Sequence, residues 1–376
     1  MLRRLLEGYT SENLLVITST TGMRMSNDTE RLECQHISFP VLGVSRIRWF
    51  GRLKHILNWA ILGLACCTAL LSIVWKRVDA VVTVMHGRFY FAAALAAYLT
   101  QVPYIVVVHD DFISTANHVS GFSANILFPL ARRVLRSAAH VYSVSVEMQN
   151  FLRREFGVDS ELQLPATTSS AVRKQCSFDT ENGPVVVFAG GVTYAVEDSL
   201  NLMANLITSG CAARYGLPNL KLRLYSPIST EQVKQLRWDH KNIEIEGWVT
   251  QSELLDGLTN ADILFLPYSF ADSSRHAVET AFPSKTADYL ASGKPILILA
   301  PNFSSLVRYA KKEGFAEIVE EFDPGTLAES IQRIASSPAY RASLAKKAHQ
   351  VFYKNHDIIR QRAKFSTMLR QLTSVH

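Results

Sequence analysis

The sequence lacks any recognisable cysteine framework. It holds five cysteines, and their spacing fits neither a set of disulfides nor a zinc site. This excludes a disulfide-stapled scaffold and a structural zinc domain, and we expect a reducing, cytoplasmic environment. The cysteines are Cys34, Cys66, Cys67, Cys176 and Cys211.

Long blocks of positive charge are also absent, although the net charge is +6. The basic clusters, such as Arg3-Arg4 and Lys346-Lys347, are short and are typical of solvated helix faces. Without a basic arm or a zinc-finger spacing, the sequence does not indicate binding to nucleic acid. The modest positive excess suits anionic substrates or an anionic membrane surface instead.

A signal peptide is not expected either, because the start, MLRRLLEGYTSEN, has no apolar core and no cleavage site. One run without charge, Ile56–Trp75, is long enough to cross a bilayer, and basic residues flank it on both sides. A strand-like run follows directly and the α/β pattern continues, which favours a helix packed in the first domain over a membrane span. Contact of this helix with a membrane face stays open.

Short β-branched runs alternate with helical patterns along the whole chain. With 48% hydrophobic residues in 376, the chain can bury large cores, and its length favours two domains. The alternation predicts the α/β fold class, with two doubly wound Rossmann-like domains of parallel strands. The predicted strands are 14–19, 79–85, 104–109 and 140–145 in the first half, and 184–190, 220–226, 243–247, 262–268, 295–300 and 316–319 in the second.

A polar stretch rich in Ser and Thr separates the two series of strands. It predicts a first domain at 1–167, a linker at 168–183 and a second domain at 184–355. Two such domains in tandem place a ligand cleft at the carboxyl ends of their strands.

Two segments of the second domain carry candidate chemistry. The FAGG segment, 188–191, follows a strand, and its glycines would let backbone amides approach an anion. Pro283-Ser284-Lys285 then begins a predicted helix at 284–292, with Asp288 on roughly the same face. A lysine at a helix start is unfavourable unless an anion binds there, so Lys285 predicts a phosphate site.

These segments resemble the donor-binding domain of the family 4 glycosyltransferases, which have the two-domain GT-B fold. The similarity covers roughly 183–350 and follows the family order of FAGG, EGWV, ADILFLPYS and PSKTADYLASGKP. VDAVVTVMHG, VPYIVVVHDD and SAAHVYSVSVEMQNFL are similar, more loosely, to the acceptor-side domain. The resemblance implies that a C-terminal helix, 356–376, returns to the first domain.

The resemblance implies roles for particular residues. The second of two family glutamates at the donor falls on Asp288, and the first falls on Thr280, next to Glu279. Two basic family positions after the glycine turn fall on uncharged residues, Gly191 and Val196, so Lys285 and Arg275 are the nearest substitutes. The implied catalytic residues are His109, Glu279 and Lys285; the donor residues are Gly190, Gly191, Thr280, Ser284, Lys285 and Asp288; the acceptor-side residues are His86 and Asp110.

One family part is missing from the beginning of the sequence. The family begins with a strand, a Gly-rich loop and a helix, whereas MLRRLLEGYT resembles only the end of that helix. We therefore expect the first sheet to lack one strand and to expose an edge near LLVITS.

The resemblance implies transfer of a sugar from a nucleotide-diphosphate donor to a glycan, polysaccharide or lipid-linked acceptor, with retention of configuration. It implies neither a metal nor a cofactor, and no Asp-x-Asp motif follows a strand. Two alternatives remain open, namely a nucleotide-sugar epimerase of the same fold and an inactive relative that serves as a partner protein.

Overall fold

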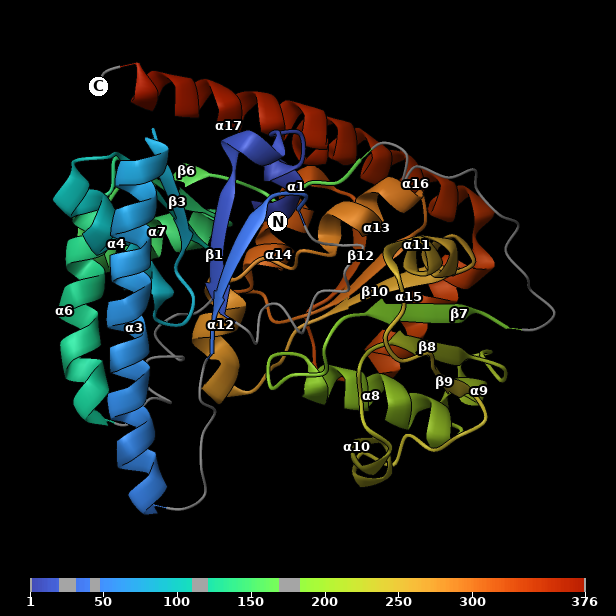
Figure 1. Ribbon diagram of the computed structural model, residues 1–376. Coiled ribbons are helices and arrows are strands. Elements are labelled where there is room, and N and C mark those ends of the chain that lie inside the picture. Colours follow the sequence, from blue (N-terminus) through green and yellow to red (C-terminus); the bar gives the residue numbers. More distant parts are fainter. Residues whose placement is uncertain (1, 20–31, 41–47, 110–120, 169–182, 375–376) are drawn as a thin grey trace. The chain divides into compact units, whose positions relative to one another are not determined.

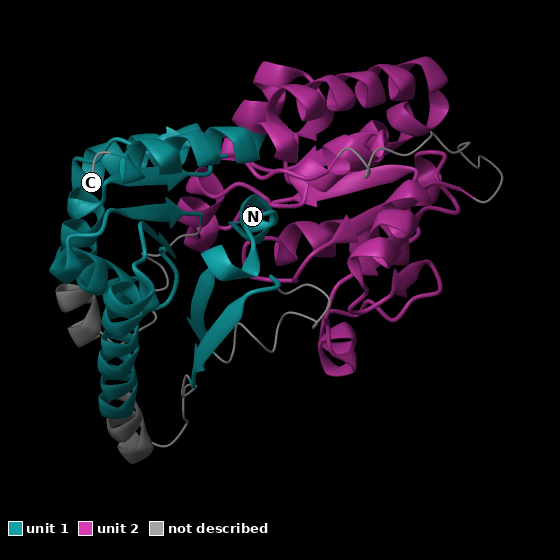
Figure 2. Cartoon of the chain, turned by 45° about the horizontal axis from the view of Figure 1, so that its top comes forward, with its two compact units in different colours: residues 1–163, 361–376 teal, residues 164–360 magenta. Residues whose placement is uncertain are grey.

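The computed structural model describes residues 2–19, 32–40, 48–109, 121–168 and 183–374. These residues fall into two compact units. Unit 1 comprises residues 1–163 and 361–376, and unit 2 comprises residues 164–360 (Figure 2). The predicted linker, 168–183, lies almost entirely outside the described residues.

Unit 2 is built on a sheet of six parallel strands in the order β12-β11-β10-β7-β8-β9. Its central strands are buried on both faces, which explains their continuous runs of Val, Ile and Leu. The strands are β7 (Val185–Ala189), β8 (Lys221–Tyr225), β9 (Ile243–Ile245), β10 (Ile263–Pro267), β11 (Ile296–Leu299) and β12 (Ala316–Val319).

Helices connect the strands of unit 2 and supply its core together with the sheet. Leu200 and Met203 of α8 and Leu327 and Ile331 of α15 belong to the same buried cluster as the sheet residues. The helices are α8 (Glu197–Thr208), α9 (Cys211–Arg214), α10 (Thr230–Gln235), α11 (Gln251–Thr259), α12 (Arg275–Thr280), α13 (Thr286–Ser292), α14 (Ser305–Glu313), α15 (Pro324–Ser336) and α16 (Pro338–Val351).

The strand order of unit 2 reverses between β7 and β10. The chain runs from β7 outward to β8 and β9 and then crosses to β10 on the other side of β7. In open parallel sheets, ligands bind beyond the carboxyl ends of the strands at such a reversal. The loops after β7 and β10 are therefore the first place to look for a site in this unit.

Unit 1 contains two parallel sheets instead of one. Four strands follow the order β3-β4-β5-β6, and β1 pairs only with β2 among the described residues. Hence one edge of β1, which corresponds to LLVITS, is not hydrogen-bonded to another described strand, as the sequence led us to expect. The strands are β1 (Leu15–Ser19), β2 (Gln35–Phe39), β3 (Val81–Val84), β4 (Tyr104–Val108), β5 (His140–Ser143) and β6 (Glu161–Leu162).

The long uncharged run forms a single helix, α3 (Arg48–Lys76). One face packs in unit 1, where Leu62 and Ala65 meet Phe39 of β2 and Ala92 of α4. Only 28% of the most apolar part of α3 is buried, however, and this part is long and apolar enough to cross a membrane. The other helices of unit 1 are α1 (Leu2–Leu6), α4 (Phe89–Thr100), α6 (Gly121–Ser137) and α7 (Val146–Phe156).

The last helix, α17 (Ile358–Thr373), leaves unit 2 and packs on unit 1. Its Arg362 donates to the Arg4 carbonyl oxygen of α1 and pairs with Glu7, the residue after α1, at 2.8 Å. Farther along, the Ser366 hydroxyl lies 3.1 Å from that of Tyr9, and the Phe365 ring packs on Tyr142.

The fold class predicted from the sequence is confirmed, because the two halves form separate parallel sheets. Individual elements differ from the prediction, and the short strand β6 is absent from the predicted strands. Helix α13 begins at Thr286 and not at residue 284, because Pro283 and Ser284 belong to the preceding turn. Strand β2 was not predicted, because its sequence, QHISF, is half polar and lies apart from the other predicted elements.

Candidate functional site

The glycine turn after β7 has a conformation that only glycine adopts readily. Gly190 has φ = 152°, and a Cβ atom there would lie 3.3 Å from the Phe188 ring. Its amide donates to the Tyr225 carbonyl oxygen at 3.0 Å, which extends the pairing of β7 with β8. Because Gly190 has no side chain, the backbone at the carboxyl end of β7 stays open to close approach.

Lys285 lies beside this turn. Its Nζ atom is 3.9 Å from the position that a Cβ atom of Gly190 would occupy. The two segments that the sequence singled out, FAGG and PSK, therefore meet at the strand-order reversal of unit 2. Lys285 is the N-cap residue of α13, which has only seven residues. The dipole of so short a helix contributes little, and the approach to Gly190 locates the positive charge better than the helix start does.

Tyr289 fixes α13 against the end of β7. The paired residues of β7 and β10 end at Val187, so the amide of Ala189 lies beyond that ladder. The Tyr289 hydroxyl accepts a hydrogen bond from this amide at 2.9 Å. Complete burial raises the pKa of Tyr289, so the hydroxyl stays neutral at physiological pH.

The loop that follows Gly191 is tied to the loop that follows β10. The Ser269 amide donates to the Ala195 carbonyl oxygen at 2.7 Å. The Ser274 hydroxyl donates to the backbone carbonyl oxygen of Tyr194 at 3.0 Å. The Asp198 carboxylate accepts from the Ser269 hydroxyl at 2.9 Å and from the Phe270 amide at 2.8 Å. These bonds hold both carboxyl-end loops in place at the reversal.

Two buried polar residues follow Lys285 on α13. Thr286 is 0% exposed, and its hydroxyl makes no hydrogen bond within the described part of the chain. Asp288, the predicted ribose ligand, is 4% exposed. Sequence reasoning missed Thr286, because a threonine in the first turn of a helix is ordinary and only the packing shows that its hydroxyl lacks a partner.

The remaining residues predicted near the donor lie close together in the sequence but differ in their burial and contacts. Ser284 is exposed and precedes Lys285. Thr280 is buried, and its hydroxyl already donates to the His276 carbonyl oxygen at 2.8 Å, one turn back on α12. Glu279 is half-buried on the same helix. Arg275, considered as a substitute phosphate ligand, stacks over the Phe303 ring at 4.3 Å.

The acceptor-side histidines meet at the carboxyl edge of the four-stranded sheet in unit 1. His86 follows β3 and His109 follows β4, and their rings stack with centroids 6.4 Å apart. Arg88, two residues after His86, lies over the Trp59 ring at 5.5 Å, and burial lowers its pKa. Sequence reasoning did not single out Arg88, although a basic residue after a strand end was a usable signal. Asp110 lies outside the described residues.

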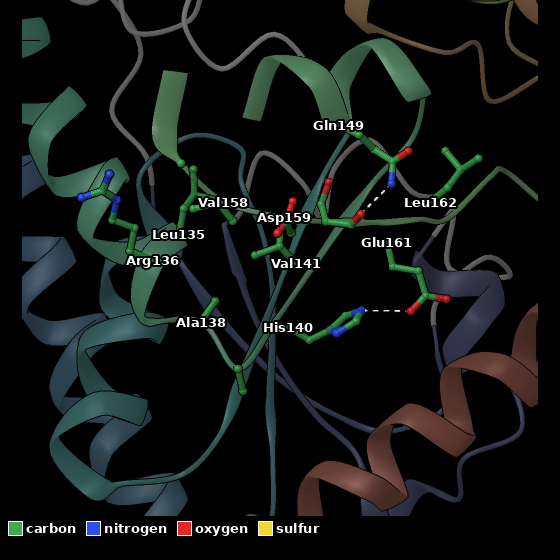
Figure 3. Close-up of a pocket in the computed structure, with 13 residues that line it drawn as sticks. Leu135, Arg136, Ala138, His140, Val141, Gln149, Val158, Asp159, Glu161 and Leu162 are labelled. Atoms are coloured by element: carbon green, nitrogen blue, oxygen red, sulfur yellow. Dashed lines mark hydrogen bonds and ion pairs between the residues drawn. The ribbon is translucent and has the colours of Figure 1, made fainter. Parts of the chain in front are cut away.

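A hollow of about 640 Å³ lies elsewhere in unit 1 (Figure 3). His140 lines it and points at Glu161, with Nε2 and Oε2 3.3 Å apart. Burial lowers the pKa of His140, while the Glu161 carboxylate opposes that shift. His140 begins β5, whereas His109 follows the end of the parallel strand β4, so the two histidines lie at opposite ends of the sheet. The hollow is therefore separate from the predicted acceptor edge.

The described residues contain no group of three or more His, Cys, Asp or Glu side chains that could hold a metal ion. At the glycine turn Lys285 supplies a positive charge.

The two Rossmann-like units define a GT-B fold, and comparison with solved structures agrees. HepE of Anabaena with UDP-glucose matches with a TM-score of 0.69 at 13% identity, covering 98% of this chain and 94% of that one. Sucrose-phosphate synthase of Thermosynechococcus elongatus matches with a TM-score of 0.66 at 14% identity, covering 94% and 86%. An epimerase-type structure from Listeria monocytogenes matches with a TM-score of 0.54 at 11% identity, covering 96% and 97%. At these identities the likeness shows the fold alone.

The first half of the chain matches a protein-family model. Residues 4–165 match the model of the glycosyl transferase 4-like domain. This match agrees with the resemblance to the family 4 glycosyltransferases drawn from the sequence. Comparison with proteins of curated function gave no significant match.

Proposed function

We propose that the chain transfers a sugar from a nucleotide-diphosphate donor to a hydroxyl group of a glycan, polysaccharide or lipid-linked acceptor. The observation that carries this proposal is the position of Lys285 Nζ beside the Gly190 turn at the strand-order reversal of unit 2. A cation next to a glycine-opened backbone suits a diphosphate, because charge-assisted hydrogen bonds to phosphate oxygens are strong. HepE, of the same fold, has been solved with UDP and with UDP-glucose, which supports uridine nucleotides as the first donors to test.

The chemistry of the transfer explains why positive charge belongs at this turn. The bond between the anomeric carbon and the diphosphate oxygen breaks, and the acceptor oxygen bonds to the same carbon and loses its proton. Negative charge accumulates on the leaving diphosphate, where Lys285 and the backbone amide of Gly191 stabilise it. The Gly190 amide already donates to the Tyr225 carbonyl oxygen, so Gly190 contributes by letting the diphosphate approach the backbone closely. We assign this role to these groups without a metal ion or cofactor. Retention of the anomeric configuration is proposed from the family resemblance.

The assignment of the other residues follows the same resemblance. Asp288 is proposed to accept hydrogen bonds from the ribose, and Ser284 to contact the diphosphate beside Lys285. His109 and Glu279 are assigned to the reacting centre, and His86 and Asp110 to the acceptor. Thr280 is the least suited of the donor residues, because its hydroxyl already bonds to the His276 carbonyl oxygen.

That bond also favours one alternative function. A chain with an occupied Thr280 hydroxyl and uncharged residues at Gly191 and Val196 could serve as an inactive partner of another transferase. An epimerase of this fold is the second alternative. Both differ from a transferase in their products: an epimerase converts the free nucleotide sugar, and an inactive chain converts nothing.

A thermal-shift titration with nucleotide sugars tests the donor site. A ligand that binds only the folded chain raises the melting temperature, and the rise increases with the ratio of ligand concentration to Kd. We expect UDP and a UDP-sugar to raise it in the presence of EDTA, and Lys285→Ala to weaken this binding about tenfold or more, as loss of a charge-assisted hydrogen bond implies. Lys234→Ala, at an exposed lysine of the same unit, is the matched control and should bind like the wild type.

Product analysis separates the three functions. Transfer to an added acceptor, with the anomeric configuration read by NMR, supports the proposal. Ligand binding that Lys285→Ala leaves unchanged would contradict the assigned site. Binding that disappears with EDTA and returns with Mg²⁺ would contradict metal independence.

A further inference from the structure

Helix α3 presents an apolar face outward. Its large exposed side chains recur at helical spacing along the whole stretch. Leu64 is 59% exposed and Trp75 is 79% exposed. A helix that lies in water normally shows polar residues on its outer face, but the stretch Ile56–Trp75 of α3 contains no charged residue. The exposed large apolar residues of α3 are Ile56, Leu57, Trp59, Leu64, Leu71, Val74 and Trp75.

The opposite face of α3 is held by unit 1. Ala69 and Ile73 pack on Ala96 of α4, in addition to the contacts of Leu62 and Ala65. The helix therefore cannot cross a bilayer without leaving its own core. In this arrangement only the outer face is free to meet another apolar phase, which is the geometry of a helix lying along an interface.

Helix α4 adds to the exposed apolar surface. It packs alongside α3, and Figure 1 shows the two helices side by side. Leu95, Tyr98 and Leu99 of α4 are each about half exposed or more. Tyrosine and tryptophan side chains, here Tyr98 and Trp75, are enriched where one end of a side chain is apolar and the other is wet.

The charge at the two ends of α3 decides among the possible partners of this face. No Asp, Glu, Lys or Arg lies between Lys54 and Lys76, while Arg48, Arg52 and Lys54 stand at one end and Lys76 and Arg77 at the other. Pairing of α3 with α3 of a second copy would bring basic ends together in either orientation. An anionic lipid surface instead attracts both ends at once.

We propose that the outer face of α3, with the exposed residues of α4, rests on the surface of an anionic membrane as a monotopic contact. The apolar side chains enter the boundary between headgroups and acyl chains, and the basic ends of α3 meet the lipid phosphates. This inference stands independently of the sugar-transfer proposal, because it uses no residue of the donor site.

Vesicle flotation with the full chain tests the proposal. The wild type should float with vesicles of phosphatidylcholine mixed with phosphatidylglycerol, bind weakly to phosphatidylcholine alone, and be released by alkaline carbonate. Leu64→Glu replaces an exposed leucine by a charge and should lower the vesicle partition coefficient roughly tenfold or more. Ile359→Glu, at a 70% exposed residue of α17, is the matched control and should leave flotation unchanged.

Several results would overturn the proposal. They are flotation of Leu64→Glu equal to that of the wild type, equal loss in the control, or equal binding to neutral and anionic vesicles. Resistance to carbonate would show a membrane span. A wild type that does not float but forms a dimer, which Leu64→Glu converts to monomer, would show that a second copy covers this face. Melting temperatures of both variants confirm that they fold.

Discussion

The Thr286 hydroxyl is a buried polar group without a hydrogen-bond partner in the described part of the chain. Burial of such a group costs about 1–3 kcal/mol, and residues of this kind persist in proteins where a ligand or function needs them. Thr286 follows Lys285, whose ammonium group lies beside the glycine turn. We infer that the hydroxyl serves the donor nucleotide.

Thr286→Val tests this at the scale of a residue. Valine has nearly the same shape and removes only an unpaired hydroxyl, so the melting temperature should stay the same or rise. Affinity for a UDP-sugar should fall by about two- to tenfold, the effect of one lost hydrogen bond. Thermal melts and a binding titration measure the two effects separately.

Thr259→Val provides the comparison. The Thr259 hydroxyl donates to the Leu255 carbonyl oxygen at 2.8 Å, so its removal should lower stability slightly and leave donor binding alone. If Thr286→Val instead destabilised the chain without changing affinity, the hydroxyl would have a structural role in solution.

At the scale of the element, α13 depends on β7 for its position. The Tyr289 hydroxyl accepts a hydrogen bond from the Ala189 amide, which lies beyond the residues of β7 that pair with β10. Tyr289→Phe leaves this amide buried and unpaired, which should cost about 1–3 kcal/mol of stability. Because the same bond sets the glycine turn opposite Lys285, donor affinity should fall as well.

Melting temperature and nucleotide affinity are measured together for this variant. Tyr353→Phe, at an exposed tyrosine of unit 2, should change neither. A Tyr289→Phe chain of normal stability and normal affinity would show that α13 is positioned by its apolar contacts alone.

The sequence predicted the strands and helices of unit 2 well, but it did not predict which of their residues lie close together. Buried strands such as β7 and β10 appear as unbroken apolar runs, and the predicted bounds differ from the observed ones by at most two residues at either end. The start of α13 was misplaced, because Pro283 satisfies the sequence rule for a first helical residue while lying in the preceding turn. The approach of Lys285 to Gly190 and the unpaired Thr286 hydroxyl depend on packing between distant segments, which no local pattern encodes.

At the scale of the whole molecule, the chain passes between the two units twice, after residue 163 and after residue 360. In unit 2, the segments next to these two points are joined by hydrogen bonds. The Thr167 amide donates to the His356 carbonyl oxygen at 3.0 Å, and the Ile358 amide donates to the Thr167 carbonyl oxygen at 3.0 Å. His356 is 0% exposed. Its Nδ1–H donates to the Pro165 carbonyl oxygen at 2.6 Å, and its Nε2 lies 2.9 Å from the Tyr309 hydroxyl.

A neutral imidazole satisfies both contacts, because Nδ1–H donates to the Pro165 carbonyl oxygen and Nε2 is able to accept from the Tyr309 hydroxyl. Burial lowers the pKa of His356 from 6.5 to about 4, although the Pro165 carbonyl oxygen and Glu313 oppose the shift. The unfolded chain therefore takes up this proton near its ordinary pKa, and the folded chain only near pH 4. Stability from this residue is present above the unfolded pKa and is lost as the pH falls toward the folded one.

The expected loss is roughly 1 kcal/mol between pH 7.5 and pH 5.5, from the linkage between pKa and stability. This corresponds to about 2–4 °C in melting temperature for a unit of this size. His356→Gln removes the titration and keeps both hydrogen bonds, since its amide nitrogen can donate to Pro165 and its oxygen can accept from Tyr309. Other groups titrate in both proteins, so the quantity to compare is the difference between their melting temperatures across this pH range. We expect the wild type to lose more than the variant by about that amount, and parallel curves would show that His356 contributes nothing to the acid sensitivity of the junction.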